Sequence, residues 1–568
     1  MEKKTAKPRN KFIDGLVARM TLEQKIGATL TLAFTGVIPG QDTYDYITKY
    51  HCGGLRLTPV LKAGATVQYI DPKTGSSGAK TANVSKGPVC TAAEYKATLD
   101  KLRKVAKARP LGLPLHFSTD HEGGGASNMY FSSIFPYPMG IRATNDPKMA
   151  YLVAKANAEM CRATGVNCTH SPDLDINCDP RSTEVCIRAY SDNAEEVAQY
   201  AIEACKGFKE GGLIATAKHF PGRGASIVDA HYEVPVIDVD KETLWNRELL
   251  PYRKLIEQDL LPSIMIAHTI YPALDPNDVA TVSKPIITGL LREELGFEGV
   301  ITTDSMTMGG IINRYGVAEA CAMALEAGAD LVLMKAQNHL VEDTFNAILS
   351  FVESGRISME ELDKKVYRIL NMKYEYGLFH DYEQDDVDVE AIVHSSKQTQ
   401  LAMDVAKRST LIARDKENFL PLKPEERVLV IEQCVAHVNS AQWHSGMLYE
   451  SFLPYSSNVS YLETSIRWSE EDIAAIKSAI GSYDKIVITN YFERSVLSNV
   501  KELTELLEGT DKDIIVIADT PYEETSIPHN AKSVILTFAA SPESGKVVAG
   551  VLFGKINPEG VWPVAYHA

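Results

Sequence analysis

The residues best suited to proton transfer stand together in the segment 218–232. Two of them, Asp229 and His231, are separated by a single residue. In an extended stretch, residues i and i+2 face the same way, so the carboxylate can accept a hydrogen bond from one imidazole nitrogen and leave the other for proton transfer. Histidine suits that role because its unperturbed pKa lies near the pH at which most enzymes work. Two alternatives stand beside it: an ordinary loop histidine with a salt-bridged neighbour, and a metal site built from His219, Asp229 and His231.

The carboxylate of Asp304 is a second candidate for chemistry. It follows the apolar run Gly299–Ile301 and two threonines, so we expect it at the end of a buried strand. A carboxylate in that position can attack the anomeric carbon of a sugar and hold the sugar covalently while the proton donor switches to a base. The alternative is an aspartate whose side chain caps the next helix.

Short apolar strands alternate with helical stretches through the first 340 residues. A helix is predicted after Asp146, with Pro147 in its first turn and Gly165 at its end, and further helices are expected to end before Gly211 and Gly328. This alternation predicts an α/β fold of the (β/α)8 TIM-barrel type. The eight predicted strands are 29–34, 54–57, 113–118, 167–171, 214–217, 263–267, 300–303 and 330–334.

Polar side chains follow one predicted strand after another, at the point where each strand ends. In a TIM barrel the catalytic face is formed by the carboxyl ends of the strands. Because six successive strands share this feature, we predict a single site on that face. The residues concerned are Asp120, Glu122, Asp173, Asp175, Lys218, His219, His268, Asp304 and Lys335.

A second α/β alternation follows residue 425. Its predicted strands are 427–432, 485–489, 514–518 and 534–538, which indicate a three-layer α/β sandwich around a parallel sheet. The predicted organisation is therefore a TIM-barrel catalytic domain at 1–382, a linker and entry segment at 383–425, and a C-terminal sandwich domain at 426–568. No glycine-rich phosphate-binding motif follows these strands, so no cofactor is expected.

Two loops could reach the site. The segment 62–88 is rich in Gly, Ser, Lys and Thr, and is either a solvated loop or a lid over the pocket. The second domain carries His437 and His444 in another loop, which is either solvated or lent to the pocket.

The composition of the chain limits the classes of binding partner that we expect. The net charge of −16 argues against nucleic acid and against an anionic membrane surface. No run of roughly 20 apolar residues and no signal-peptide pattern is present, so a cytoplasmic protein is expected. The nine cysteines form no Cys-x-x-Cys pair, so no metal site is expected from them. We interpret the five that cluster loosely, at 161, 168, 178, 186 and 205, as reduced core residues. The expected partner is a small carbohydrate, and the expected oligomeric state is a monomer or homodimer.

Several segments resemble family 3 of the glycoside hydrolases, in order and over nearly the whole chain. The tail 551–560 resembles that family's second domain, and the loop at 229–231 is similar to its β-N-acetylglucosaminidase branch, in which a histidine paired with an aspartate is the acid/base. Relatives that resemble β-glucosidases take a glutamate from the second domain instead. The segments of the first domain are Met20-Thr-Leu-Glu-Gln-Lys-Ile-Gly27, Asp120-His-Glu-Gly-Gly124, Lys218-His-Phe-Pro-Gly222, Ile266-Ala-His268, Leu291-Arg-Glu-Glu-Leu-Gly-Phe-Glu-Gly299 and Ala327-Gly-Ala-Asp-Leu-Val-Leu-Met334.

The resemblance implies an exo-acting retaining β-N-acetylglucosaminidase with a covalent intermediate. It assigns Asp304 as nucleophile, His231 as acid/base and Asp229 as the partner that orients His231. The residues expected to bind the sugar are Asp120, Arg188, Lys218, His219 and His268, since carboxylates and fixed cations bind sugar hydroxyls well.

Two positions depart from the family pattern. Arg223 stands where the branch commonly has a second histidine, and Asn128 stands where it commonly has an arginine. Three other functions therefore remain as alternatives: a phosphorylase of the same fold, since a neutral histidine repels phosphate less than a glutamate does; a β-glucosidase; and a non-catalytic carbohydrate-binding protein.

Overall fold

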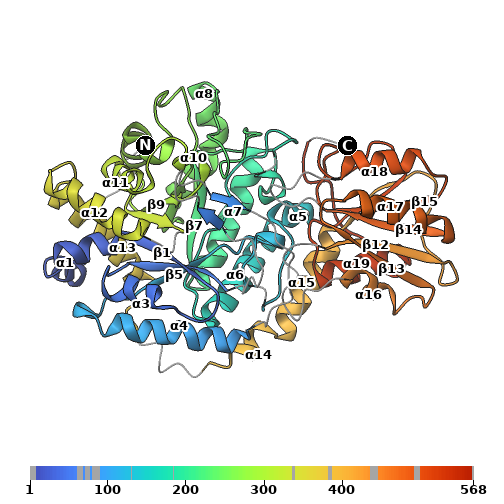
Figure 1. Ribbon diagram of the computed structural model, residues 1–568, viewed down its shortest axis with the longest axis horizontal. Helices are drawn as coiled ribbons and strands as arrows, with labels where there is room; N and C mark the ends of the chain where they lie inside the picture. Colours follow the sequence, from blue (N-terminus) through green and yellow to red (C-terminus); the bar gives the residue numbers. More distant parts are fainter. Residues whose placement is uncertain are drawn as a thin grey trace.

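The computed structural model describes residues 8–59, 68–70, 77–79, 90–129, 131–182, 184–335, 339–380, 387–434, 446–491 and 499–565. Two domains lie side by side along the long axis of the molecule (Figure 1). The first, coloured blue to yellow, contains a closed barrel, and the second, coloured orange to red, contains an open sheet.

The barrel confirms the predicted TIM-barrel fold. Its eight strands are all parallel and close in the order β1-β2-β5-β6-β7-β8-β9-β10. Each strand overlaps one predicted from its apolar run, and every residue of β7 and β9 is buried. The strands are β1 Leu30–Thr35, β2 Gly54–Thr58, β5 His116–Thr119, β6 Cys168–Thr169, β7 Ile214–Phe220, β8 Ser263–Ile266, β9 Val300–Ser305 and β10 Leu331–Met334.

Helices cover the outside of the barrel, and their ends carry the predicted signals. Asp146 caps α6 by accepting a hydrogen bond from the Lys148 amide, and Gly328 follows α11 with a φ of 123°. That φ is accessible to glycine at low cost. The helices of this domain include α1 Lys11–Val17, α2 Leu22–Ala28, α3 Gln41–Thr48, α4 Ala92–Lys107, α5 Pro138–Ala143, α6 Pro147–Ala163, α7 Ala194–Glu210, α9 Leu250–Glu257, α10 Gly309–Ile312, α11 Val317–Ala327, α12 Leu340–Glu353 and α13 Met359–Glu375.

The second domain is the predicted three-layer sandwich, with one correction to its sheet. The strand order is β11-β16-β15-β14-β12-β13, and β11 runs antiparallel to β16, so the sheet is mixed and not purely parallel. Helices α17 and α18 pack on one face, and α15, α16 and α19 pack on the other. The elements are α15 Ser396–Ser409, β11 Leu411–Asp415, β12 Val428–Cys434, α16 Met447–Phe452, β13 Val459–Ser465, α17 Glu470–Ala479, β14 Lys485–Asn490, α18 Val500–Glu508, β15 Asp513–Ala518, β16 Ser533–Leu536 and α19 Pro542–Leu552.

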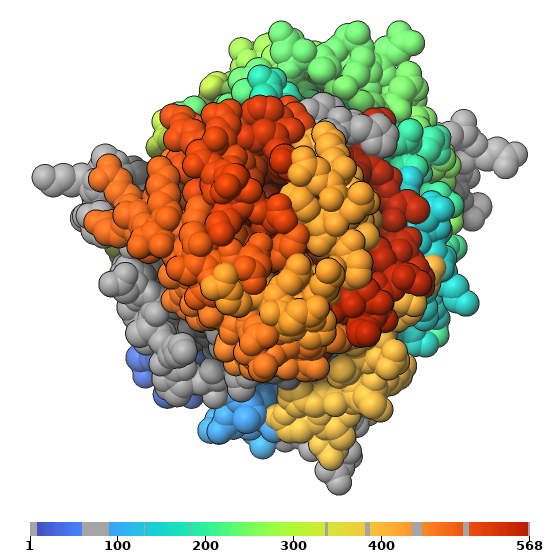
Figure 2. Space-filling model, turned by 90° about the vertical axis from the view of Figure 1, so that its right-hand side faces the viewer, coloured from blue at the N-terminus to red at the C-terminus, as the bar shows by residue number. Residues whose placement is uncertain are grey.

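The two domains share an apolar contact. Met139 and Ala143 of α5 belong to the same buried cluster as the residues of β14, β15 and β16. A Cβ atom on Gly140 would lie 2.6 Å from the Cβ of Phe538, so only glycine allows this approach. The Asn177 amide also donates to the Tyr522 hydroxyl at 2.7 Å. Figure 2 looks onto the second domain, with green and cyan parts of the barrel emerging around its edge.

Other expectations meet the structure only in part. The cysteines predicted to be reduced at 161, 168, 178, 186 and 205 are free, and all but Cys178 are buried. Among the described helices, none is both long and apolar enough to cross a membrane. Within the segment 62–88, only β3 Gln68–Ile70 and β4 Ser77–Ala79 are described, and they pair antiparallel. The rest of this segment, which was interpreted as either a solvated loop or a lid, lies outside the described residues. His437 and His444 also lie outside them.

Candidate active site

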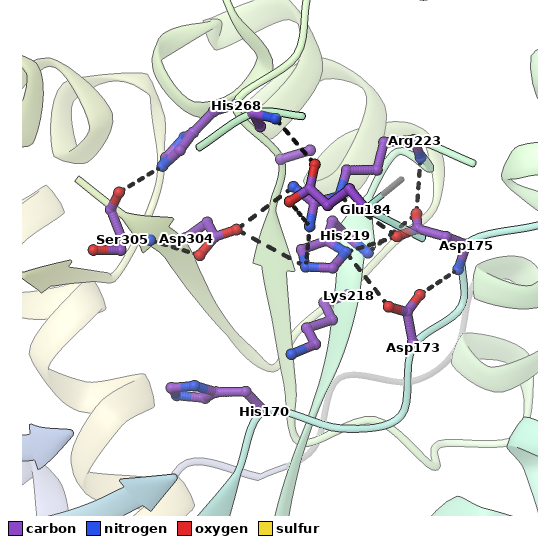
Figure 3. A network of polar contacts seen from close by, with 12 residues as sticks. His170, Asp173, Asp175, Glu184, Lys218, His219, Arg223, His268, Asp304 and Ser305 are labelled. Atoms are coloured by element: carbon purple, nitrogen blue, oxygen red, sulfur yellow. Dashed lines mark hydrogen bonds and ion pairs between the residues drawn. The ribbon is translucent and has the colours of Figure 1, made fainter. Parts of the chain in front are cut away.

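The carboxyl ends of the barrel strands bring the predicted polar residues into one contact network (Figure 3). Side chains in the last residues of β7 and β9, and in the loops that follow β5 and β6, are joined by hydrogen bonds and ion pairs across the mouth of the barrel. Lys335, after β10, adds a positive charge close enough to act on Asp304. The site predicted from strand ends alone therefore forms one continuous network of charges.

Asp304 lies within β9 and faces two nitrogen groups. Its Oδ1 accepts a hydrogen bond from the Ser305 amide at 2.7 Å, and its Oδ2 lies 3.9 Å from Nε2 of His219 and 3.8 Å from Nη1 of Arg223. The next helix, α10, begins with Met308 as its N-cap. Asp304 is thus not a helix cap, and its Oδ2 is directed into the site.

The surroundings of Asp304 keep it ionised. Burial by itself raises the pKa of this carboxyl group, but His268, Arg223 and Lys335 outweigh burial and hold the pKa below its usual range. A nucleophilic carboxylate must be ionised before it attacks, so the electrostatics suit the predicted role.

His219 is held between a carboxylate and a guanidinium. Its Nδ1 lies 2.6 Å from Oδ2 of Asp175, and its Nε2 lies 2.8 Å from Nη2 of Arg223. A guanidinium only donates, so Nε2 accepts and the proton of this imidazole sits on Nδ1. Both ring nitrogens are therefore engaged by protein groups, and His219 fixes Arg223 beside Asp304.

The Asp229–His231 pair forms the predicted hydrogen bond, but in a turn and not in the extended stretch from which it was predicted, since the Tyr232 amide donates to the Asp229 carbonyl at 3.1 Å. Nδ1 of His231 lies 2.7 Å from Oδ1 of Asp229. A second carboxylate, Glu184, also approaches this nitrogen, with its Oε1 at 3.2 Å. Glu184 is buried, whereas the side chain of His231 is 23% exposed, which leaves the imidazole open to a substrate. Glu184 is not among the site residues predicted from the sequence.

The backbone of this loop rests on α10, directly after the strand that carries Asp304. The amide of Gly309 donates to the carbonyl of His231 at 3.1 Å, and the amide of Gly310 donates to the carbonyl of Ala230 at 3.1 Å. A Cβ atom on Gly309 would lie 2.7 Å from the carbonyl oxygens of both His231 and Tyr232. The absence of a side chain at Gly309 thus sets how closely the loop approaches the nucleophile.

Gly309→Ala is expected to lower kcat/KM by about tenfold or more, because the added methyl group displaces the loop and a 1 Å misplacement of a catalytic group is costly. Gly316→Ala is the matched control, since a Cβ atom there meets nothing within 4 Å. Steady-state kinetics and thermal unfolding of both variants check this. Equal activity of the two variants would show that the contact does not position the loop.

The cations predicted to bind sugar are paired with Glu122. Arg188 donates from Nε to Oε2 of Glu122 at 2.8 Å, and Lys218 contacts Oε1 of the same carboxylate. Burial raises the pKa of Glu122, but Arg188 and Lys218 outweigh burial and lower it. All three side chains are buried, so their charges are compensated within the protein.

Asp120 is the most exposed acidic group of this part of the site, with a side chain 25% exposed. Its Oδ1 lies 3.0 Å from Nδ1 of His170 and 3.8 Å from Nζ of Lys218, and its Oδ2 contacts Arg56. Asn128 stands where an arginine was expected, and its backbone N–H donates to the Asp120 carbonyl at 2.9 Å. Arg56 on β2 therefore supplies a guanidinium at Asp120.

His268 follows the end of β8, as predicted, but its contacts differ from those expected of a sugar-binding residue. It is fully buried, with Nε2 donating to the Ser305 carbonyl at 2.9 Å and Nδ1 at 2.6 Å from the Thr281 hydroxyl. Both nitrogens are used by protein groups. We therefore expect His268 to hold the end of β9 in place, without contacting a sugar hydroxyl.

The metal site considered for His219, Asp229 and His231 does not form as one cluster. The structure places these residues in two separate groups. Arg223 bonds to both groups, through Nε2 of His219 and Oε1 of Glu184, and its charge opposes a cation at either. The two groups are Asp173, Asp175 and His219, and Glu184, Asp229 and His231.

Comparisons with known proteins agree with this architecture. Beta-hexosaminidase A of Pseudoalteromonas piscicida is 31% identical over 295 residues, which are 48% of this chain and 49% of that protein. Beta-N-acetylglucosaminidase/beta-glucosidase of Cellulomonas fimi is 28% identical over 354 residues, 60% of this chain and 61% of that protein. The alignments thus span 49% and 61% of the lengths of these curated relatives, less than two thirds of either.

A solved structure and a family model cover more of the chain. The structure of a glycoside hydrolase family 3 β-N-acetylglucosaminidase from Paenibacillus sp. str. FPU-7 superposes with a TM-score of 0.83 at 28% identity, covering 96% of this chain and 99% of that one. The model of the glycosyl hydrolase family 3 N-terminal domain matches residues 21–372, which is more than half of the chain. This chain belongs to glycoside hydrolase family 3.

Proposed function

We propose that this chain is an exo-acting, retaining β-N-acetylglucosaminidase. The observation that carries the proposal is the histidine held by two carboxylates, on a loop hydrogen-bonded to the segment that follows an ionised Asp304. A retaining glycosidase needs a nucleophilic carboxylate and a separate proton donor, and these two groups meet that need. The relative at 31% identity is named a beta-hexosaminidase, and the relative at 28% identity is named a beta-N-acetylglucosaminidase/beta-glucosidase. Both names support an amino sugar as the substrate.

The reaction follows from these positions. The carboxylate of Asp304 attacks the anomeric carbon while the bond from that carbon to the leaving oxygen breaks, and Nε2 of His231 delivers its proton to that oxygen. Nδ1 stays hydrogen-bonded to Asp229, which fixes the ring and leaves Nε2 for proton transfer. A water molecule then gives a proton back to His231 and attacks the same carbon, while the bond from that carbon to Asp304 breaks. The sugar leaves with its configuration retained, and the carboxylate of Asp304 is regenerated.

Two alternatives share this chemistry. Phosphate could replace water in the second step, since a histidine that has lost its proton is neutral and repels a phosphate dianion less than a carboxylate would. A β-glucoside could replace the amino sugar, as the second activity in the name of the Cellulomonas fimi relative suggests.

A panel of aryl β-glycosides tests the proposal, with and without millimolar phosphate. The N-acetylglucosaminide should be cleaved with the highest kcat/KM, and free β-configured sugar should be the first product by NMR, at a rate that phosphate does not change. A sugar phosphate as product would replace hydrolysis by phosphorolysis. A preference for the glucoside would overturn the sugar assignment, and sugar binding without turnover on any glycoside would reduce the chain to a carbohydrate-binding protein.

A further inference from the structure

Glu184 is a buried carboxylate in the loop between β6 and α7, and it touches three parts of the site. Its side chain is only 4% exposed. Burial raises its pKa, but the adjacent Arg223 and His231 together outweigh burial and lower it, so the group is ionised. A buried charge is costly to keep, and this one needs an explanation beyond packing.

The first contact of Glu184 is with the proton donor. Its Oε1 lies 3.2 Å from Nδ1 of His231, the nitrogen that Asp229 holds at 2.7 Å. Asp229 accepts the hydrogen bond from Nδ1, and the negative charge of Glu184 acts on the same nitrogen without a hydrogen bond of its own, so both carboxylates favour the tautomer with the proton on Nδ1. Proton exchange with a substrate is then confined to Nε2.

The second contact is with the two ends of the loop that carries the donor. Oε1 of Glu184 lies 2.7 Å from Nη2 of Arg223, at the start of the loop, and Oε2 accepts a hydrogen bond from the Ala230 amide at 3.0 Å, at its end. One side chain thereby ties both ends of the segment 223–230. The place of His231 depends on this tie, since His231 directly follows Ala230.

The third contact leads to the nucleophile. Arg223 bonds to Glu184 and at the same time places Nη1 3.8 Å from Oδ2 of Asp304 (Figure 3). Arg223 is fully buried, and its Nη2 also bonds to His219. Glu184 and Arg223 thus form a charged bridge between the predicted proton donor and the predicted nucleophile.

We propose that Glu184 is a positioning residue for the acid/base His231, a second carboxylate that holds the imidazole and its loop in the geometry needed for proton transfer. This inference rests on the function proposed above. The competing interpretation is that Glu184 only neutralises the buried charge of Arg223, in which case its effect on activity would pass through Asp304 and not through His231.

A double-mutant cycle separates these two roles, because residues that act through one another give non-additive losses. The variants are Glu184→Gln, His231→Ala and the double variant, assayed on a β-glycoside that the wild-type protein cleaves and whose leaving group needs a proton. Glu184→Gln keeps the size of the side chain and removes its charge. Alone, it should lower kcat/KM by about tenfold to a hundredfold, as expected for a partner that orients a functional group. In the His231→Ala background it should lower kcat/KM no further.

Glu432→Gln is the matched control. Glu432 is also buried and accepts backbone hydrogen bonds, from Leu448 and Tyr449, but it lies in the second domain. This variant should keep wild-type kcat/KM. If Glu184→Gln does not fold, Glu184→Asp retains the charge and withdraws it by one methylene, and the same cycle is run with it.

The outcomes point in different directions. A full loss from Glu184→Gln in the His231→Ala background, or no loss in either background, would overturn the positioning role. If His231→Ala itself leaves activity intact, the proposed function fails and the role of Glu184 fails with it. A loss confined to the background with His231 supports the inference, whatever sugar the wild-type protein prefers.

Discussion

Asp304→Ala is expected to lower kcat/KM for an aryl β-N-acetylglucosaminide by about 10⁴-fold or more, since the variant has no group that can bond to the anomeric carbon. Neighbouring carboxylates cannot substitute. Glu122 is tied to Arg188 and Lys218, Asp175 is tied to His219, and all of these side chains are buried. The expected fall appears in kcat for good and poor leaving groups alike, because bond formation at carbon is required for both.

The pH profile provides a second measurement. The pKa of Asp304 lies below its usual range, so the carboxylate stays ionised as the pH falls through mildly acidic values. The acidic limb of kcat/KM should therefore not report Asp304 above about pH 4, the unperturbed pKa of an aspartate. A limb at higher pH that disappears in a variant of another residue would identify that residue as its source.

Controls separate lost chemistry from lost folding. Asp415→Asn removes the charge of an aspartate that accepts backbone hydrogen bonds in the second domain, as Asp304 does in the first, and should leave activity unchanged. A fluorinated glycosyl fluoride that forms a slowly hydrolysed intermediate should lose its anomeric fluoride. The mass of the remaining glycosyl group should then be found on the peptide that contains Asp304. Labelling of a different peptide, or more than about 1% residual kcat/KM in Asp304→Ala, would reject Asp304 as the nucleophile.

The barrel strands and the core strands of the sandwich could be predicted because they are buried on both faces and read as short apolar runs. The two strands missed in the second domain lie at the edges of its sheet. β11 has one buried residue out of five, and β13 has two out of seven. Edge strands face solvent and carry polar side chains, so the hydrophobic signal that identified β14 and β15 is absent from them.

In the site, too, residues whose role follows from their sequence neighbours could be predicted, and residues whose partners are distant in the sequence could not. Asp304 could be predicted from the strand before it. The Asp229–His231 contact was predicted from a spacing of two residues in an extended stretch, whereas the structure forms it in a turn, in which the His231 amide also donates to Oδ1 of Asp229. Arg56 offered a signal that was overlooked, a charge inside the apolar run Gly54–Leu57. Glu184 offered none, because it lies in a loop without periodicity and its partners, Arg223 and His231, come from the next strand and loop along the chain.

Arg223 illustrates why a single departure from a family pattern is hard to interpret from sequence alone. The sequence shows only that an arginine stands where the family commonly has a histidine. The effect of this arginine on the site depends on three side chains that lie far apart in the sequence and meet only in the folded protein. Glu184, His219 and Asp304 surround its guanidinium. A buried cation placed there without Glu184 would face a large desolvation cost, so the two residues form one unit in this chain.

His231→Ala is expected to produce losses that depend on the leaving group. For a glycoside whose leaving group needs a proton, such as a disaccharide, kcat/KM should fall by about 10²- to 10⁴-fold, the usual contribution of a general acid. For a dinitrophenyl glycoside, whose leaving group is already a weak base, kcat/KM should change little, since no proton is needed to break that bond. The second step still lacks its base, so the covalent intermediate should accumulate and kcat should fall together with KM.

Azide makes this prediction sharper, because it is a nucleophile that needs no base. Added azide should raise kcat of His231→Ala on the dinitrophenyl glycoside and yield a β-glycosyl azide, and it should leave the wild-type protein unaffected. Asp229→Asn should show the same dependence on the leaving group with a smaller loss, since Nδ1 keeps Glu184 at 3.2 Å when the charge of Asp229 is removed. A loss of equal size on every leaving group, with no response to azide, would mean that His231 shapes the pocket and that the proton comes from elsewhere. The gradation from Asp229→Asn to His231→Ala thus measures how far two carboxylates share the control of one imidazole.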